Sequence, residues 1–131
     1  MAYSNPDRRS YVFPAVDFGA GNTSHSFQGP KGKAGRLVAI HLSASETFTN
    51  TTTQGQILVG TGADTDAYAL MNLGTTAATD SVSSDDGVTD TDAILSADIP
   101  ADTQVEVTCV APTGGTPAGI GTVTVLVDWA H

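Results

Sequence analysis

Residues 121–129 read Gly-Thr-Val-Thr-Val-Leu-Val-Asp-Trp, and this stretch indicates the fold class most clearly. Alternate positions carry large apolar side chains, namely Val123, Val125, Val127 and Trp129. The positions between them are mostly polar, and include Thr122, Thr124 and Asp128. Successive side chains of a β-strand point to opposite faces, so this period of two predicts a strand with one buried and one solvent-facing side.

The same alternation recurs upstream. The further predicted strands are Gln104–Ala111, Arg36–Phe48 and Gln54–Gly60. Within Arg36–Phe48 we expect Val38, Ile40 and Leu42 on one face and His41 on the other. Asp66–Gly74 fits a helical face as well as a strand, and we favour a strand because its predicted neighbours are strands.

The earliest strand candidate is Tyr11–Phe18, which contains Pro14. Proline has no N–H to donate to a neighbouring strand, so this segment is expected at a sheet edge or as an extended arm. Thr47–Thr53 and Asp98–Asp102 read as turns, and Thr75–Asp92 reads as a long exposed loop. Pro112–Gly119 is rich in glycine and proline, and we expect it to join the last two strands as an antiparallel hairpin.

Six to eight predicted strands and no helical pattern indicate an all-β protein, in the form of a small antiparallel β-sandwich or jelly-roll-like domain. A chain of 131 residues has the usual size of one domain. We therefore expect a single β-sandwich domain over residues 19–131, preceded by an extended N-terminal arm over residues 1–18.

Charge is distributed unevenly along the chain. No lysine or arginine follows Arg36, whereas twelve of the fourteen acidic residues do. Residues 1–36 thus carry a net charge of +3 and residues 37–131 a net charge of −12, which together give the −9 of the whole chain. An acidic body repels phosphate, so we expect no nucleic acid partner. We also expect no membrane partner and no secretion, because neither a long apolar span nor a signal-peptide pattern is present.

Residues that could carry catalysis or bind a metal are weakly patterned. His25, His41 and His131 have no accompanying motif of a catalytic triad, and Cys109 reads as a small apolar core residue. The loop aspartates could gather around a cation, but their spacing matches a calcium loop poorly; they are Asp64, Asp66, Asp85, Asp86, Asp90 and Asp92. We therefore expect no enzymatic activity, no cofactor and no metal site.

The basic residues are more suggestive, because they flank an aromatic segment. Charged and aromatic side chains together are typical of a docking surface. The predicted partner-binding residues are Arg8, Arg9, Tyr11, Phe13, Phe18, Lys31, Lys33 and Arg36.

The chain resembles head decoration (capsid cement) proteins of tailed phages. The resemblance lies in the extended segment Tyr11–Phe18, in the Thr/Ala/Gly/Asp-rich β body, and in the closing run from Ile99 through Pro112–Gly119 to Val123–Trp129. It covers most of the chain in character and contains no diagnostic motif. It implies a structural protein on the exterior of a capsid that binds the major capsid protein, bridges neighbouring capsid subunits, and self-associates as a homotrimer more readily than as a dimer.

Two alternatives stay open. The first is a carbohydrate-binding β-sandwich of a tail or fibre, although beyond residue 27 the aromatic side chains that could stack on sugars are few: Phe48, Tyr68 and Trp129. The second is a tail-tube or head-completion subunit, which would form rings by itself.

Overall fold

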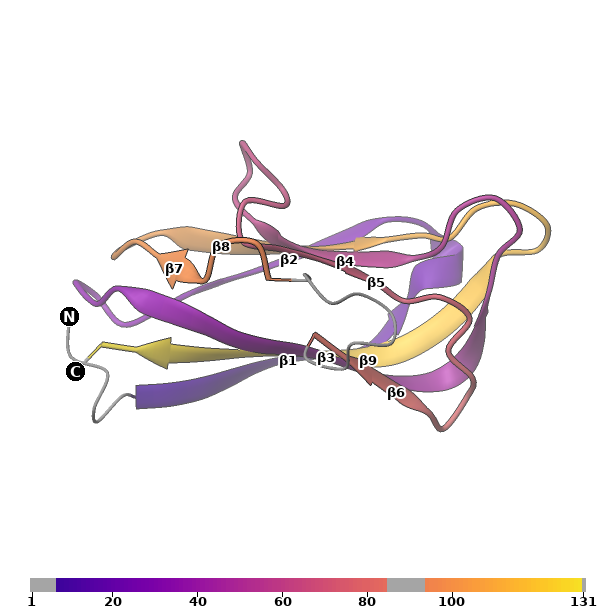
Figure 1. Ribbon diagram of the computed structural model, residues 1–131, viewed down its shortest axis with the longest axis horizontal. Coiled ribbons are helices and arrows are strands. Elements are labelled where there is room, and N and C mark those ends of the chain that lie inside the picture. The colour runs from indigo at the N-terminus through magenta and orange to yellow at the C-terminus, as the bar shows by residue number, and fades with distance from the viewer. Residues whose placement is uncertain (1–6, 85–93, 131) are drawn as a thin grey trace.

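The computed structural model describes residues 7–84 and 94–130, and these form a sandwich of two antiparallel sheets (Figure 1). The first sheet has the strand order β1 (Asp7–Asp17), β9 (Ala118–Trp129), β3 (Gly35–Thr49) and β6 (Ser81–Ser83), with β7 (Asp98–Ile99) also paired to β3. The second sheet has the order β2 (Thr23–Gln28), β8 (Gln104–Val110), β4 (Gln56–Gly60) and β5 (Ala69–Asn72). A short 3-10 turn, η1 (Phe18–Ala20), connects β1 to β2. The predicted all-β sandwich is confirmed.

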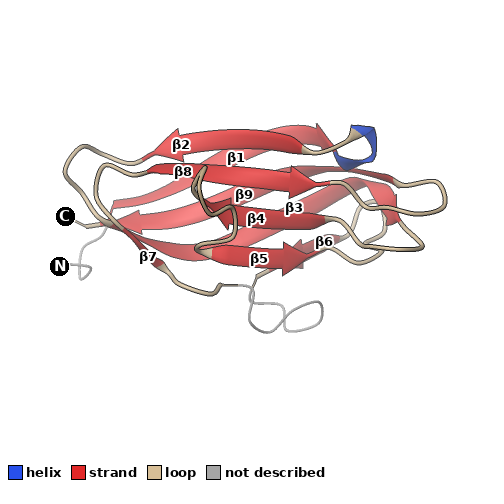
Figure 2. Cartoon of the chain, turned by 90° about the horizontal axis from the view of Figure 1, so that it is seen from above, coloured by secondary structure: helices blue, strands red, loops and turns tan. Residues whose placement is uncertain are grey.

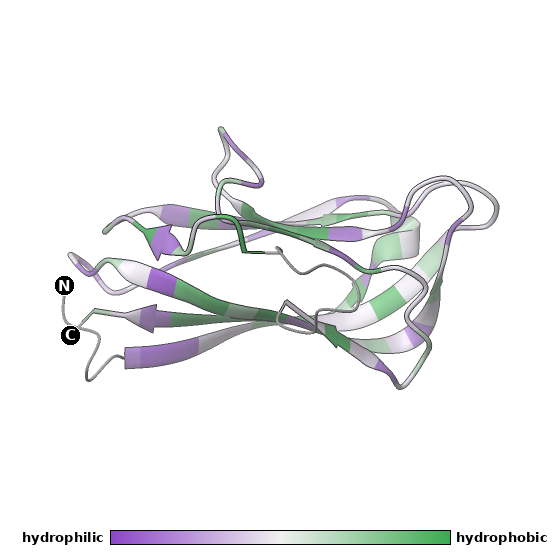
Figure 3. Ribbon diagram, in the orientation of Figure 1, coloured by the Kyte–Doolittle hydropathy of each residue, from purple (hydrophilic) through white to green (hydrophobic). Residues whose placement is uncertain are grey.

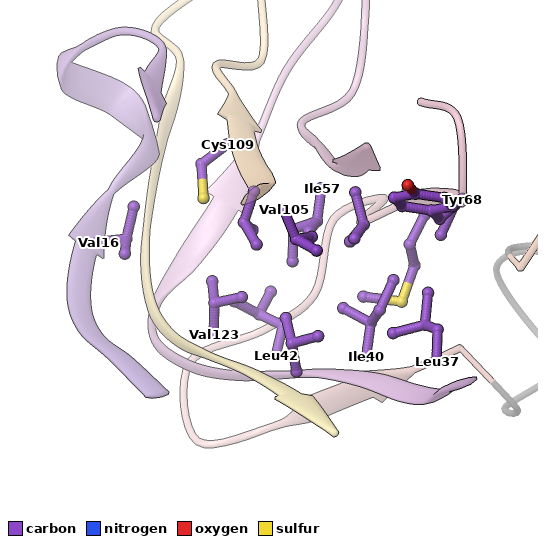
Figure 4. Close-up of a cluster of buried hydrophobic side chains, with 14 of the residues drawn as sticks. Val16, Leu37, Ile40, Leu42, Ile57, Tyr68, Val105, Cys109 and Val123 are labelled. Carbon is purple, nitrogen blue, oxygen red and sulfur yellow. The ribbon is translucent and has the colours of Figure 1, made fainter. Parts of the chain in front are cut away.

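The hydrophobic core lies between the two sheets, as Figure 4 shows for a cluster of its side chains. The first sheet contributes Leu37, Ile40, Leu42, Val123, Val125 and Val127, all at most 2% exposed. The second sheet contributes Ile57, Val59, Met71, Val105, Val107 and Cys109, all fully buried. Each set alternates with more exposed positions along its strand, as the period of two predicts.

The predicted hairpin between the last two strands is wrong. β8 pairs with β2 and β4, whereas β9 pairs with β1 and β3, so the two strands belong to different sheets. Residues 111–117 therefore cross from one sheet to the other. Strands on opposite sides of one core have the same alternating pattern as strands side by side, so the sequence pattern did not distinguish the two arrangements.

Residues 7–18 are part of the sandwich, where the sequence predicted an arm over residues 1–18; residues 1–6 lie outside the described part of the chain. β1 pairs with β9 from Asp7 to Asp17 and forms an edge of the first sheet, as the proline suggested. Its register shifts between Phe13 and Val16, where Pro14 lies, and Ala15 there adopts a φ of +53°. Such a bulge accommodates a residue that cannot donate to the ladder.

Three other local predictions need adjustment. A register shift between Leu37 and Ala39 turns Leu37 into the core and leaves Val38 half-buried, so Val38 does not share a face with Ile40. β2 lies in a segment for which no strand was predicted. The expected loop Thr75–Asp92 contains β6, with Val82 in the core, while its residues 85–92 fall outside the described residues.

Asp66–Gly74 does contain a strand, β5, and no helix. The turn predicted at Asp98–Asp102 begins with the two-residue strand β7. β3 extends through Thr49 into the segment expected to turn at Thr47–Thr53.

Candidate partner-binding surface

All five lysine and arginine residues of the chain gather at one end of the sandwich, at the left in Figure 1. Strand register brings them there, because Asp7 at the start of β1 and Gly35 at the start of β3 both pair with Trp129 at the end of β9. Arg8 and Arg9 therefore lie at the start of β1 and Arg36 at the start of β3, while Lys31 and Lys33 lie in the loop that enters β3. We call these five residues the cationic end. Figure 3 shows the hydrophilic colour at the starts of β1 and β3.

Asp128 lies between two of these cations. The register places Arg8 and Arg36 on either side of it, one on each neighbouring strand. Arg8 donates from Nε to Asp128 Oδ1 at 2.6 Å and from Nη2 to Oδ2 at 2.9 Å. The hydrogen bond from Arg8, against the opposing effect of burial, lowers the pKa of Asp128, and the charge of Arg36 lowers it further. The same contact raises the pKa of Arg8. Two-point pairing of this kind fixes the direction of the guanidinium.

Arg9 lies on the opposite face of β1, and its Nε donates to Asp7 Oδ2 at 2.9 Å. Both residues pair with inward-facing residues of β9, so this ion pair lies at the open margin of the core. Charged side chains that point inward on an edge strand hinder the addition of another strand. Arg9 thus has a structural explanation that needs no partner.

Lys31 and Lys33 are exposed, and both belong to a tight turn. The N–H of Lys33 donates to the carbonyl of Pro30 at 3.1 Å, and Gly32 between the lysines has a φ of +75°. The N–H of Gly32 donates to Asp102 Oδ1 at 2.8 Å, which ties the turn to the segment between β7 and β8. Gly35 also anchors this loop, because an added Cβ would lie 2.6 Å from the indole of Trp129. The backbone of the turn that carries the two lysines is therefore fixed by contacts with the rest of the sandwich.

The predicted aromatic docking residues all make ring contacts within the fold. Phe18 is fully buried and packs edge-to-face on Phe48, with ring centroids 5.1 Å apart, so its prediction as a partner contact is wrong. Tyr11 stacks on Phe27 at 3.9 Å and accepts a hydrogen bond from Trp129 Nε1 at 2.9 Å. Phe13 is half-buried and stacks on His25 at 4.8 Å. These rings close the side of the sandwich between the edges of the two sheets.

The remaining candidate residues show no assembled chemistry within residues 7–84 and 94–130. No three histidine, cysteine or acidic side chains there could hold a metal ion together. Asp85, Asp86, Asp90, Asp92 and His131 lie outside the described residues. Cys109 is buried, and burial raises the pKa of its thiol to about 11, so it is protonated at neutral pH. No described helix is long and apolar enough to span a membrane.

No known protein family model and no curated protein matches the chain. Among solved structures, a chain of the cyanophage Pam1 capsid asymmetric unit is similar at a TM-score of 0.46 and 12% identity, over 96% of this chain and 86% of that chain. A chain of the acid-stable capsid of Helicobacter pylori bacteriophage KHP30 is similar at a TM-score of 0.43 and 12% identity, over 93% of each chain. Both likenesses are too distant to transfer a function or a residue role.

Proposed function

We propose that the chain is a structural virion protein that binds the outer surface of a phage capsid and cements neighbouring capsid subunits. The observation that carries the proposal is the gathering of every lysine and arginine at one end of the sandwich, while the charged groups elsewhere in the described chain are all acidic. Asp7, Asp98, Asp102 and Asp128 also lie at the cationic end, so its five cations and four carboxylates leave a net charge of +1. The resemblance of the sequence to capsid cement proteins supports the same assignment. The proposed partner is the major capsid protein, and the protein itself is proposed to be a homotrimer.

The charge distribution suits such a role physically. A basic end is attracted to an acidic patch, and the acidic remainder of each copy repels its neighbours. That remainder includes Asp17, Glu46, Asp64, Asp66, Asp80 and Glu106. Many copies that bind only the assembled lattice stabilise it by mass action, so each single contact can be weak.

Within the predicted set of partner-binding residues we propose a narrower contact surface. Arg8 and Arg9 each have a carboxylate partner within the chain, and Tyr11, Phe13 and Phe18 pack against other rings. Lys31 and Lys33 are exposed on a turn that the hydrogen bond from Gly32 to Asp102 fixes in place. We therefore assign the main electrostatic contact to these two lysines, with Arg8 and Arg36 beside them.

The carbohydrate-binding alternative is not favoured by any observation in the described residues. Its three candidate stacking platforms are Phe48, Tyr68 and Trp129, which are 0%, 7% and 1% exposed. A sugar ring needs an exposed aromatic face to stack on. The tail-tube or head-completion alternative predicts rings or tubes of the isolated protein, which light scattering on the free protein would detect.

Co-sedimentation with capsids that lack this protein tests the proposal. We expect saturable binding that weakens as salt rises from about 50 to 500 mM, because the contact is between exposed charges. Light scattering on the free protein would report its oligomeric state. Absence of binding, together with rings or tubes of the free protein, would refute the proposal in favour of the tail-tube reading.

A further inference from the structure

A sandwich of two open sheets has four edges, and edge strands expose unpaired backbone N–H and C=O groups. Soluble proteins usually obstruct such edges, because an open edge can pair with a strand of another chain. Here β1 and the pair β6 and β7 border the first sheet, and β2 and β5 border the second. Figure 2 shows β2 and β5 at opposite margins of their sheet.

Three of these edges are obstructed. β1 contains Pro14 and a register shift, and the Arg9–Asp7 ion pair lies on its inner face. β6 and β7 are three and two residues long, too short to pair with an extended segment. β5 is four residues long and is covered at its start, because Ala69 forms a bridge with Ile94 and the N–H groups of Leu95 and Ser96 both donate to the carbonyl of Tyr68.

β2 differs from the other three edges. Its six residues, Thr-Ser-His-Ser-Phe-Gln, pair with β8 in an unbroken register and include no proline, lysine or acidic residue. Ser24, Ser26 and Gln28 are exposed, and among the described residues no strand pairs with the other side of β2. A polar hollow of about 200 Å³ adjoins it, lined by Ser24, His25, Ser26, Gln104 and Glu106.

The lysine turn follows directly on this open edge. β2 ends at Gln28, and Lys31 and Lys33 lie three and five residues further on. The hydrogen bond from Gly32 to Asp102 fixes the turn that carries them. A segment that pairs along β2 and continues past Gln28 would therefore approach two ammonium groups.

We propose that β2 is a strand-addition site for an extended segment of the capsid partner that carries carboxylates at its end nearest Gln28. This inference rests on the proposed function and specifies how the partner is bound. Backbone hydrogen bonds to β2 would supply the pairing, and Lys31 and Lys33 would select an acidic segment.

A second copy of this chain is a poorer occupant. Antiparallel pairing of two β2 strands would place the lysine turn of each copy near the residues that precede β2 in the other. No acidic residue lies between Phe18 and Lys33, so the lysines would gain no carboxylate there. An acidic partner segment complements them instead.

Amide hydrogen exchange tests the site, measured on the full chain alone and bound to capsids that lack it. We expect alternate amides within residues 23–28 to exchange at least about tenfold more slowly in the complex, because new backbone hydrogen bonds protect them. Amides of β5 and β6 should be unchanged. Binding without protection of β2 would overturn this inference and leave the proposed function standing, whereas absence of binding would overturn both.

A charge-reversal pair tests the role of the lysines. The variant Lys31→Glu/Lys33→Glu should lose about tenfold or more in affinity for the capsids, since two attractive contacts become repulsive. Ala63→Glu/Thr65→Glu is the control, because both positions are exposed in the loop between β4 and β5 and no lysine lies there. Equal affinity of the Lys31→Glu/Lys33→Glu variant and the wild type would contradict the assignment of an acidic segment.

Discussion

The guanidinium of Arg8 and the carboxylate of Asp128 form a two-point ion pair that joins residues 120 positions apart in the chain. Asp128 also has Arg36 as its neighbour on β3, and the charge of Arg36 contributes to the lowered pKa of Asp128. We expect Asp128→Asn to destabilise the protein more than Arg8→Gln. The first variant removes the carboxylate that pairs with Arg8 and attracts Arg36, whereas the second leaves Asp128 near the charge of Arg36.

This pair also makes stability depend on pH. The pKa of Asp128 is lowered in the folded state, so its contribution is complete above the pKa of an unfolded aspartate, about 3.9, and is lost as pH falls through the folded value. Urea unfolding of wild type and Asp128→Asn should therefore differ most near neutral pH and converge at strongly acidic pH. A difference between the two that stays constant with pH would contradict a role for the charged carboxylate.

Phe18 tests whether the N-terminal segment belongs to the fold. The sequence predicted an extended arm over residues 1–18 that precedes the β-sandwich domain, but Phe18 is fully buried against Phe48. We expect Phe18→Ala to cost about 3–5 kcal/mol of unfolding free energy. Val12→Ala on the preceding strand β1 is the control, because Val12 is 53% exposed and should change stability by less than about 0.5 kcal/mol. Similar urea midpoints for the two variants would show that Phe18 is not a core residue.

Cys109 should be inert in the native protein. Its thiol is fully buried within the second sheet, and its pKa is raised to about 11 mainly by that burial. Compared with a free cysteine of pKa about 8.5, the thiolate fraction at neutral pH falls roughly 100-fold or more. We expect an aromatic disulfide reagent to label the thiol promptly in denaturant and very slowly without it. Rapid labelling of the native protein would instead indicate frequent opening of the sheet.

The strands were predictable wherever large apolar side chains alternated with polar ones. Val123, Val125 and Val127 identified β9 within the sequence. β2 was missed because Phe27 is its one large aliphatic or aromatic core residue, and its inward-facing neighbour His25 reads as polar. The assignment of β8 and β9 to separate sheets was also beyond the pattern, because alternation records which face of a strand is buried and not which strand lies beside it.

The cationic end was partly predictable for a similar reason. All five cations lie within residues 8–36, and the strand register places them at one end of the sandwich. The contacts that hold these residues could not be predicted from the sequence. Asp128, which pairs with Arg8, and Asp102, which accepts the N–H of Gly32 in the lysine turn, are both distant in sequence from their partners. The sequence therefore indicated which basic residues lie close together along the chain. Only the structure shows that Arg8 is paired with a carboxylate, whereas Lys31 and Lys33 are exposed on a turn.

The hydrogen bond from Gly32 to Asp102, which fixes the lysine turn, can be tested in the isolated protein. Asp102 accepts the N–H of Gly32 at 2.8 Å and itself has a φ of +57°, a backbone conformation that asparagine tolerates better than alanine. Asp102→Asn keeps an acceptor oxygen at the same position, whereas Asp102→Ala removes it. Loss of one such hydrogen bond is worth roughly 1 kcal/mol, or about fivefold in an opening equilibrium. We therefore expect the Gly32 amide to exchange about fivefold faster in Asp102→Ala and near the wild-type rate in Asp102→Asn. Equal rates in all three proteins would mean that this hydrogen bond does not hold the turn in solution.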